Sequence, residues 1–169
     1  SYEQCLWIDA LREVADEYKD KPIYPIFLSS LMYSMAYCSQ GTGHYAQYRD
    51  AKTNSSFNDI CIYRKKEVFK FFHKKFNELC TYSLNTKSKV NSAFLSADFK
   101  EALKTFEGGT VYADPPYCFV HYSRFYHALE TLVLYDYPEI QKKNNVIVKG
   151  RYREDRHQSP FCIKTKVED

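Results

Sequence analysis

The spacing of apolar residues over the first forty positions predicts two helices. Within residues 2–18 apolar side chains recur three and four positions apart, with acidic residues and Arg12 between them, as in a helix on a protein surface. Residues 21–25 interrupt the pattern. They contain two prolines, and a proline in the interior of a helix breaks or kinks it. Residues 26–37 resume helical spacing with a mostly apolar run, so we expect the second helix to be more deeply buried.

A polar loop and a basic helix are expected next. Residues 40–57 are rich in Gly, Thr, Asn and Ser, which is typical of exposed binding loops. Residues 58–79 place apolar side chains at helical spacing on one face and basic side chains on the other. The basic side chains are Arg64, Lys65, Lys66, Lys70, Lys74 and Lys75.

Beyond residue 91 the pattern changes to strands alternating with helices. SAFLSAD predicts a short strand that ends at Asp98, FKEALKTF a helix, and GGTVYADPPY a turn into a buried strand. Strand, helix and strand in this order predict a parallel α/β unit. Residues 125–134 predict a further helix, and residues 144–161 predict a strand that continues as a basic loop. We therefore divide the chain into a helical and loop region, 1–85, and an α/β region, 86–169.

The composition excludes several classes of protein. Hydrophobic residues make up 44% and charged residues 27%, which is an ordinary globular balance. No apolar run approaches the roughly 18 residues needed to cross a bilayer. Six cysteines follow no metal-ligand spacing and no signal peptide is present, so we expect reduced core thiols, no metal site and a cytoplasmic protein. The net charge of +3 does not by itself indicate a polyanionic partner.

The strongest candidate for chemistry is the tetrapeptide Asp114-Pro115-Pro116-Tyr117, which directly follows the predicted strand TVYA. In an open parallel sheet the ligand crevice lies beyond the carboxyl ends of the strands, where this tetrapeptide would lie. The alternative is that the prolines only end a strand and that Asp114 caps the following turn.

The tetrapeptide suits methylation of a ring amine. Such an amine is a poor nucleophile while its lone pair is delocalised into the ring, and two acceptors on its hydrogens would relocalise that lone pair. The Asp114 carboxylate supplies one acceptor and the carbonyl of Pro115 the other, because the two prolines restrict its direction. Tyr117 can then stack on the face of the base.

VYADPPY, with SRFYH downstream, resembles the catalytic region of the DNA adenine methylase group, which modifies adenine N6 in DNA. The resemblance implies an α/β, Rossmann-like methyltransferase fold with a target-recognition subdomain in region 1–85 and the catalytic residues in region 86–169. It also implies S-adenosylmethionine as methyl donor and duplex DNA with a flipped adenine as substrate, in a restriction-modification or orphan enzyme of a bacterium or phage. Cytosine N4, RNA, or a catalytically incomplete DNA-binding module remain alternatives.

The resemblance extends to further residues. Asp98 stands where the group places an acidic residue against the adenosine of the donor, although a cap on the next helix would show the same pattern. Tyr126 and His127 would shape the pocket for an everted base, and His127 also suits a satisfied core position. We expect DNA contacts from the polar loop, the basic helix and the final basic loop, with solvated surface residues as the alternative. The candidates are His44, Tyr45, Gln47, Arg49, Lys65, Lys66, Lys70, Arg151, Arg153 and Arg156.

The sequence departs from the group in one respect. The glycine-rich FxGxG turn that binds the methyl donor does not precede the tetrapeptide, and a polar loop rather than a helix follows Gly41-Thr42-Gly43. The donor motif would then belong to a longer enzyme or to a second chain, unless the protein is an inactive DNA-binding descendant. We favour the first explanation, since residue 1 is Ser rather than Met. We expect this chain alone to bind S-adenosylmethionine poorly.

Overall fold

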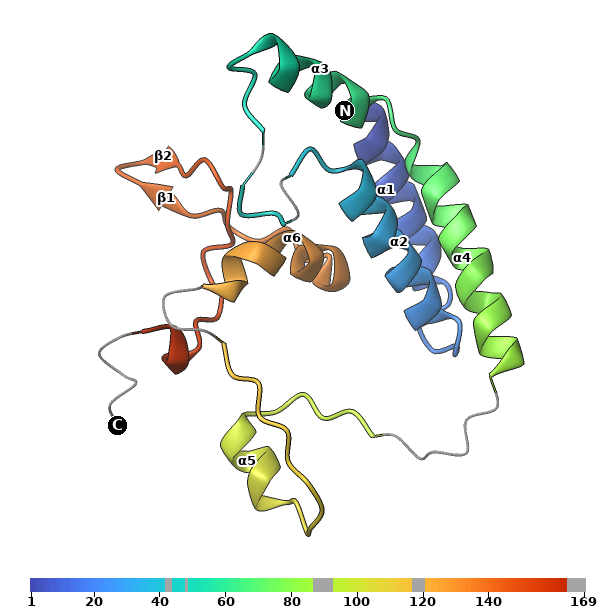
Figure 1. Ribbon diagram of the computed structural model, residues 1–169, viewed down its shortest axis with the longest axis vertical. Coiled ribbons are helices and arrows are strands. Elements are labelled where there is room, and N and C mark those ends of the chain that lie inside the picture. The colour runs from blue at the N-terminus through green and yellow to red at the C-terminus, as the bar shows by residue number, and fades with distance from the viewer. Residues whose placement is uncertain (42–43, 48, 87–92, 117–120, 164–169) are drawn as a thin grey trace.

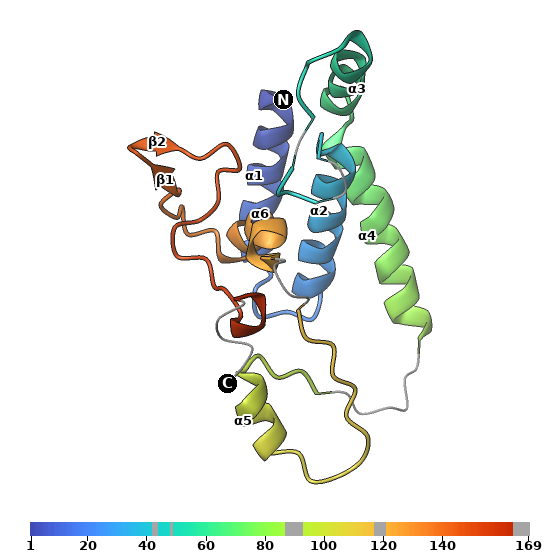
Figure 2. The same ribbon diagram turned by 60° about the vertical axis from the view of Figure 1, so that its left-hand side comes forward.

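A computed structural model describes residues 1–41, 44–47, 49–86, 93–116 and 121–163. Within these ranges the chain is mainly helical, and its only sheet is a two-stranded hairpin. Helices α1, α2 and α4 pack side by side, α6 lies against them, and the hairpin lies beyond α6 (Figures 1 and 2). Helix α5 lies on an extended arm away from this body (Figures 1 and 2).

The first two predicted helices are confirmed. Helix α1 (Tyr2–Asp16) begins with a capping box, in which the Ser1 hydroxyl accepts from the Gln4 amide at 3.3 Å and the Gln4 side chain accepts from the Ser1 amino group at 2.7 Å. Helix α2 (Tyr24–Cys38) has a proline in its first turn, where a missing amide hydrogen is tolerated. Helix α2 buries the larger apolar share, as its sequence pattern predicts.

The single helix predicted for residues 58–79 is wrong, because the structure has two helices there. Helix α3 (Asn54–Arg64) starts earlier, and α4 (Val68–Asn85) follows after a break. The side-chain amide of Gln4 donates to the carbonyls of Tyr63 and Lys66, at 2.9 Å each. These two carbonyls therefore have hydrogen-bond partners outside the helix, which stabilises the break.

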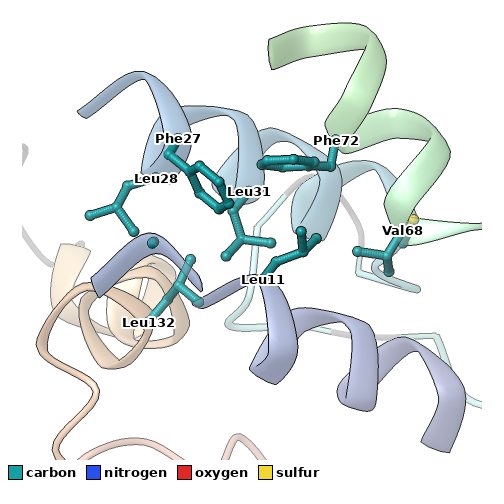
Figure 3. Packing of buried hydrophobic residues seen from close by; sticks show 9 residues of the cluster. Leu11, Phe27, Leu28, Leu31, Val68, Phe72 and Leu132 are labelled. Carbon is teal, nitrogen blue, oxygen red and sulfur yellow. The ribbon is translucent and has the colours of Figure 1, made fainter. Parts of the chain in front are cut away.

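The core lies between α1, α2 and α4 (Figure 3). Leu31 and Ala15 are fully buried and Val68 is 1% exposed. The ring of Phe27 lies 4.8 Å from that of Phe72, a distance typical of aromatic pairs in cores. Leu132 of α6 reaches the same cluster, so α6 is part of one core with the N-terminal helices.

Helix α6 (Tyr122–Leu134) confirms the helix predicted for residues 125–134. The buried Arg12 of α1 holds the C-terminal end of α6. The Arg12 Nε donates to the Leu132 carbonyl at 2.7 Å, and the Arg12 Nη2 donates to the Val133 carbonyl at 3.1 Å. A cation is favourable where helix carbonyls have no helical partner. Tyr135 then ends the helix in the left-handed conformation, with φ of 52°.

The strand predicted at the start of residues 144–161 is confirmed, but its pairing is local. Strands β1 (Lys142–Lys143) and β2 (Val146–Ile147) form an antiparallel hairpin. Asn144 and Asn145 connect them with φ values of 51° and 62°, as a tight hairpin turn of the primed type requires. The short 3₁₀ helix η1 (Pro160–Cys162) follows.

Helix α5 (Phe99–Lys104) is confirmed, whereas the two strands predicted on either side of it are wrong for the described residues. Phe94 is 97% exposed and Tyr112 88% exposed, and neither segment is in a sheet. Strands of a parallel sheet are covered on both faces and hydrogen bonded along their edges. No described segment gives these residues such cover, so the parallel α/β unit does not form in this part of the chain.

Two expectations from composition can be compared with the structure. No helix among the described residues is both long and apolar enough to cross a membrane. Cys5, Cys38, Cys61 and Cys80 are free thiols, but of these only Cys38 is buried, so the expectation of core thiols is wrong for the exposed Cys5.

Candidate functional site

The described part of the predicted catalytic tetrapeptide lies on the exposed arm that follows α5. Asp114 and Pro115 are exposed and Pro116 is half-buried, all in extended chain without regular structure, and Tyr117 lies outside the described residues. The Asp114 carboxylate does not point into the core, so it is accessible to a ligand. The arm touches the body where the ring of Phe99 lies 5.3 Å from that of Phe161.

Asp98, the predicted donor contact, caps α5. Its Oδ1 accepts a hydrogen bond from the Lys100 amide at 2.9 Å. This is the helix-cap role that its sequence position also allows. Its contact with the methyl donor stays a prediction.

The turn at Gly41 is closed by contacts within the chain. The Gly41 amide donates to the Ser39 hydroxyl at 3.1 Å, and its carbonyl accepts from Arg49 at 3.3 Å. A Cβ at this position would lie 2.8 Å from the His44 carbonyl oxygen. These contacts fix the shape of the described part of the turn, and its rejection as the donor site stays a prediction from the sequence.

A cavity of about 480 Å³ brings together predicted residues from both ends of the chain. It lies where the loop after α2, helix α6 and the segment after β2 meet. Tyr45 and Gln47 from the loop and Arg151 from the final basic segment line it. Arg64, His127 and Lys149 also line it. Arg64 was not among the ten DNA contacts predicted from the sequence. Its position in the basic cluster could have indicated it.

The walls of the cavity are tied together by side-chain contacts. The Tyr152 hydroxyl donates to the Ala46 carbonyl at 3.2 Å, and Lys149 donates to Asp50 at 2.6 Å. A Cβ on Gly150 would lie 2.1 Å from the ring of Tyr152, so only glycine allows this close approach. The loop and the distal basic segment therefore form one structural unit.

Two neutral polar side chains complete the cavity. Burial raises the pKa of Tyr45 to about 12, and its hydroxyl is buried without a hydrogen-bond partner among the described residues. Burial also lowers the pKa of His127, whose Nδ1 lies 2.8 Å from the Arg124 carbonyl. A neutral ring must place its proton on Nδ1 to donate to that carbonyl, so Nε2 is an acceptor. His127 is thus buried and also lines the cavity, as a satisfied core histidine can, and its part in a pocket for an everted base stays a prediction.

Other predicted DNA contacts of the first region lie around Tyr63. Lys66 lies 4.0 Å above this ring and donates to the Tyr37 carbonyl at 2.9 Å. Arg49 lies 4.7 Å above it and forms an ion pair with Asp59 at 3.7 Å. His44 packs on Phe125, while Lys65 and Lys70 are exposed. Lys65 and Lys70 are therefore the more accessible cations of this group.

Arg153 is held inside the protein. Its side chain is 4% exposed and pairs with the carboxylates of Asp136 and Asp155. A phosphate would have to displace both carboxylates, so the structure corrects the expectation of a DNA contact and gives Arg153 a structural role. Arg156 is half-buried, donating to the Ser123 hydroxyl at 3.0 Å. The sequence did not indicate Asp136 as a partner, because no motif links the two positions.

The family model for D12 class N6 adenine-specific DNA methyltransferases matches residues 7–161. The chain belongs to this family. D12 methyltransferases use S-adenosylmethionine, and the matched range includes both the helical body and the DPPY tetrapeptide of this D12 chain.

Three curated proteins are similar to this D12 chain. Type II methyltransferase M.FokI of Planomicrobium okeanokoites is 35% identical over 90 residues, 53% of this chain and 13% of the relative. Modification methylase LlaI of Lactococcus lactis subsp. lactis is 26% identical over 155 residues, 89% of this chain and 22% of the relative. Modification methylase StsI of Streptococcus sanguinis is 25% identical over 139 residues, 79% of this chain and 18% of the relative.

The chain thus spans less than a quarter of the length of these relatives. No solved structure matches it.

Proposed function

We propose that this chain supplies the target-recognition and catalytic segments of an enzyme that methylates adenine N6 in duplex DNA. The observation that carries the proposal is the DPPY tetrapeptide at 114–117, which lies inside the region matched by the D12 family. The exposure of Asp114 supports it, because a base must reach that carboxylate. Two of the relatives are modification methylases, which favours a restriction-modification role in bacterial or phage-infected cytoplasm.

In the proposed mechanism the chain holds the reacting amine. The target adenine leaves the duplex, which costs a few kcal/mol, and its ring stacks on Tyr117. The Asp114 carboxylate and the Pro115 carbonyl each accept one N6 hydrogen, so the nitrogen lone pair is directed away from the ring. S-adenosylmethionine supplies the methyl group when bound. N6 would bond to the methyl carbon as that carbon leaves the donor sulfur, and the proton that N6 gives up would pass to the Asp114 carboxylate. No covalent enzyme intermediate is needed.

We propose that region 86–169 completes a Rossmann-like sheet only together with a segment carrying the glycine-rich donor turn. Val111 and Tyr112, 52% and 88% exposed, precede the tetrapeptide and would become buried strand residues in that sheet. The Asp98 carboxylate is exposed and would suit one polar edge of the donor's adenosine. Region 1–85 would contact the target DNA.

The test is transfer of a labelled methyl group by an enzyme that combines this chain with a donor-binding segment. Nucleoside analysis of the product should show N6-methyladenine in DNA. Label in N4-methylcytosine or in RNA would favour the alternative substrates. Salt-dependent DNA binding without transfer would favour a DNA-binding module.

A further inference from the structure

Two arginines on the wall of the cavity are available to a ligand. Arg64 and Arg151 line it, both are exposed, and neither forms an ion pair with a described residue. Neighbouring cations are already paired, such as Lys149 with Asp50 and Arg49 with Asp59. The cavity therefore concentrates unneutralised guanidinium groups at one place.

Apart from Lys149, which pairs with Asp50, the remaining lining is neutral. No carboxylate lines the cavity within the described ranges. Gln47 offers an amide, the Tyr45 hydroxyl is without a partner among described atoms, and His127 offers an acceptor at Nε2. Guanidinium groups bind phosphate oxygens through paired hydrogen bonds, and neutral donors and acceptors suit a sugar or a base edge. The chemistry of the lining matches a nucleotide better than a simple anion.

We propose that this cavity binds one nucleotide of a DNA strand, with its phosphate between Arg64 and Arg151 and its sugar or base toward Tyr45 and His127. The volume of about 480 Å³ is within the range of roughly 300–1,000 Å³ that small ligands occupy. The choice of DNA rests on the proposed function. The site is distinct from the DPPY arm and would anchor the strand while the arm receives the target base.

The site is formed before the ligand binds. Tyr152 fills the space beside Gly150 and reaches the Ala46 carbonyl, so the two walls are held in register. The Tyr45 amide donates to the Phe125 carbonyl at 3.4 Å, which attaches the loop to α6. Little of the wall has to become ordered on binding, which favours affinity.

The first test measures binding of a labelled DNA duplex to the chain as it is, by fluorescence anisotropy at several salt concentrations. Arg64→Gln and Arg151→Gln should each weaken binding about fivefold to tenfold. Since both arginines hold one phosphate, the double variant should reduce the slope of log K against log salt by about 0.9, and not by about 1.8. Lys19→Gln removes the same charge at the turn between α1 and α2 and should have little effect on either quantity.

The second test uses Tyr45→Phe, which removes only the hydroxyl. That group has no partner in the described protein, so the melting temperature should stay equal or rise. The affinity for DNA should nevertheless fall about threefold to tenfold, because the ligand loses a hydrogen bond. If the hydroxyl had only a structural role, its removal would not leave the melting temperature equal or higher while it lowers the affinity for DNA.

The proposal is overturned if Arg64→Gln and Arg151→Gln bind DNA like Lys19→Gln while circular dichroism shows that they are folded. It is also overturned as a DNA site if inorganic phosphate displaces the DNA at a phosphate concentration similar to that of the DNA. Equal binding of an RNA duplex would overturn it in the same way. If the arginine variants bind DNA as the parent chain does, and the enzyme with the donor-binding segment still transfers methyl groups, only this inference is contradicted. If DNA binding depends on the two arginines but the enzyme with the donor-binding segment transfers no methyl group, only the proposed function is contradicted.

Discussion

Arg153 holds Asp136 through two parallel hydrogen bonds, Nη1 to Oδ1 at 2.8 Å and Nη2 to Oδ2 at 2.7 Å. Asp136 follows α6, whereas Arg153 follows the segment that lines the cavity. The pair joins these two parts of the chain in a fixed geometry, because the planar guanidinium matches the carboxylate. Asp155 contacts the same guanidinium at 3.1 and 3.2 Å.

Arg153→Lys should lower the melting temperature by a few degrees, because an ammonium group cannot form both parallel bonds. Differential scanning calorimetry measures the change. Arg151→Lys is the matched control, since that side chain is exposed and forms no ion pair with a described residue. Equal melting temperatures for the two variants would contradict a structural role for Arg153.

Stability should fall in acid partly through Asp136. Its hydrogen bonds with Arg153 hold the pKa of Asp136 below its ordinary value of 3.8. The unfolded chain then takes up a proton at a pH where the folded chain does not, so this contribution is present above about pH 5 and is lost as the pH falls through the lowered pKa. Urea midpoints measured from about pH 6 to about pH 3 should fall less steeply for Asp136→Asn. A slope identical to that of the parent chain would count against the pair.

Leu31→Ala should destabilise the helical body by about 2–5 kcal/mol, because a fully buried leucine leaves a cavity when truncated. Leu84→Ala is the control, since Leu84 is 82% exposed on α4 and should cost well under about 1 kcal/mol. Chemical denaturation gives both values. Similar losses for the two variants would mean that α1, α2 and α4 do not form the core described.

The chain alone should bind S-adenosylmethionine poorly. The 169 residues contain no FxGxG turn, and a polar loop instead of a helix follows the GxG at 41–43. Isothermal titration calorimetry should therefore show a dissociation constant of about 1 mM or weaker, which corresponds to roughly 4 kcal/mol of binding free energy or less. Micromolar binding would show that the donor site uses other residues of this chain.

The helices were predictable from local information. Ser1 and Gln4 form the capping box, and the apolar spacing of α1, α2 and α6 marks their buried faces. The break between α3 and α4 was not predictable, since Gln4, about sixty positions away, satisfies one carbonyl at the end of α3 and one within the break. Helical periodicity continues across that break and reports nothing about such a distant contact.

The site was predictable only in part. The catalytic role of DPPY is predicted without any knowledge of the fold and stays a prediction, whereas Tyr45, Gln47 and Arg151 do meet at one cavity. Arg153 looks the same as Arg151 in the sequence, yet one is buried in an ion pair and the other faces the cavity. The strands predicted around α5 depend on neighbouring strands, which local pattern does not reveal.

The most direct test of the central claim uses Asp114→Asn in an enzyme that joins this chain to a donor-binding segment. The substitution keeps the size of the side chain but replaces one carboxylate oxygen by an NH2 group, which donates hydrogen bonds and does not accept them or take up a proton. Transfer of methyl groups to adenine N6 and affinity for the DNA duplex are measured on the same preparation. We predict that transfer falls by at least about a hundredfold, as for loss of a group that acts in proton transfer, while DNA affinity changes less than about twofold. Near-normal turnover by the Asn variant would contradict the role of Asp114.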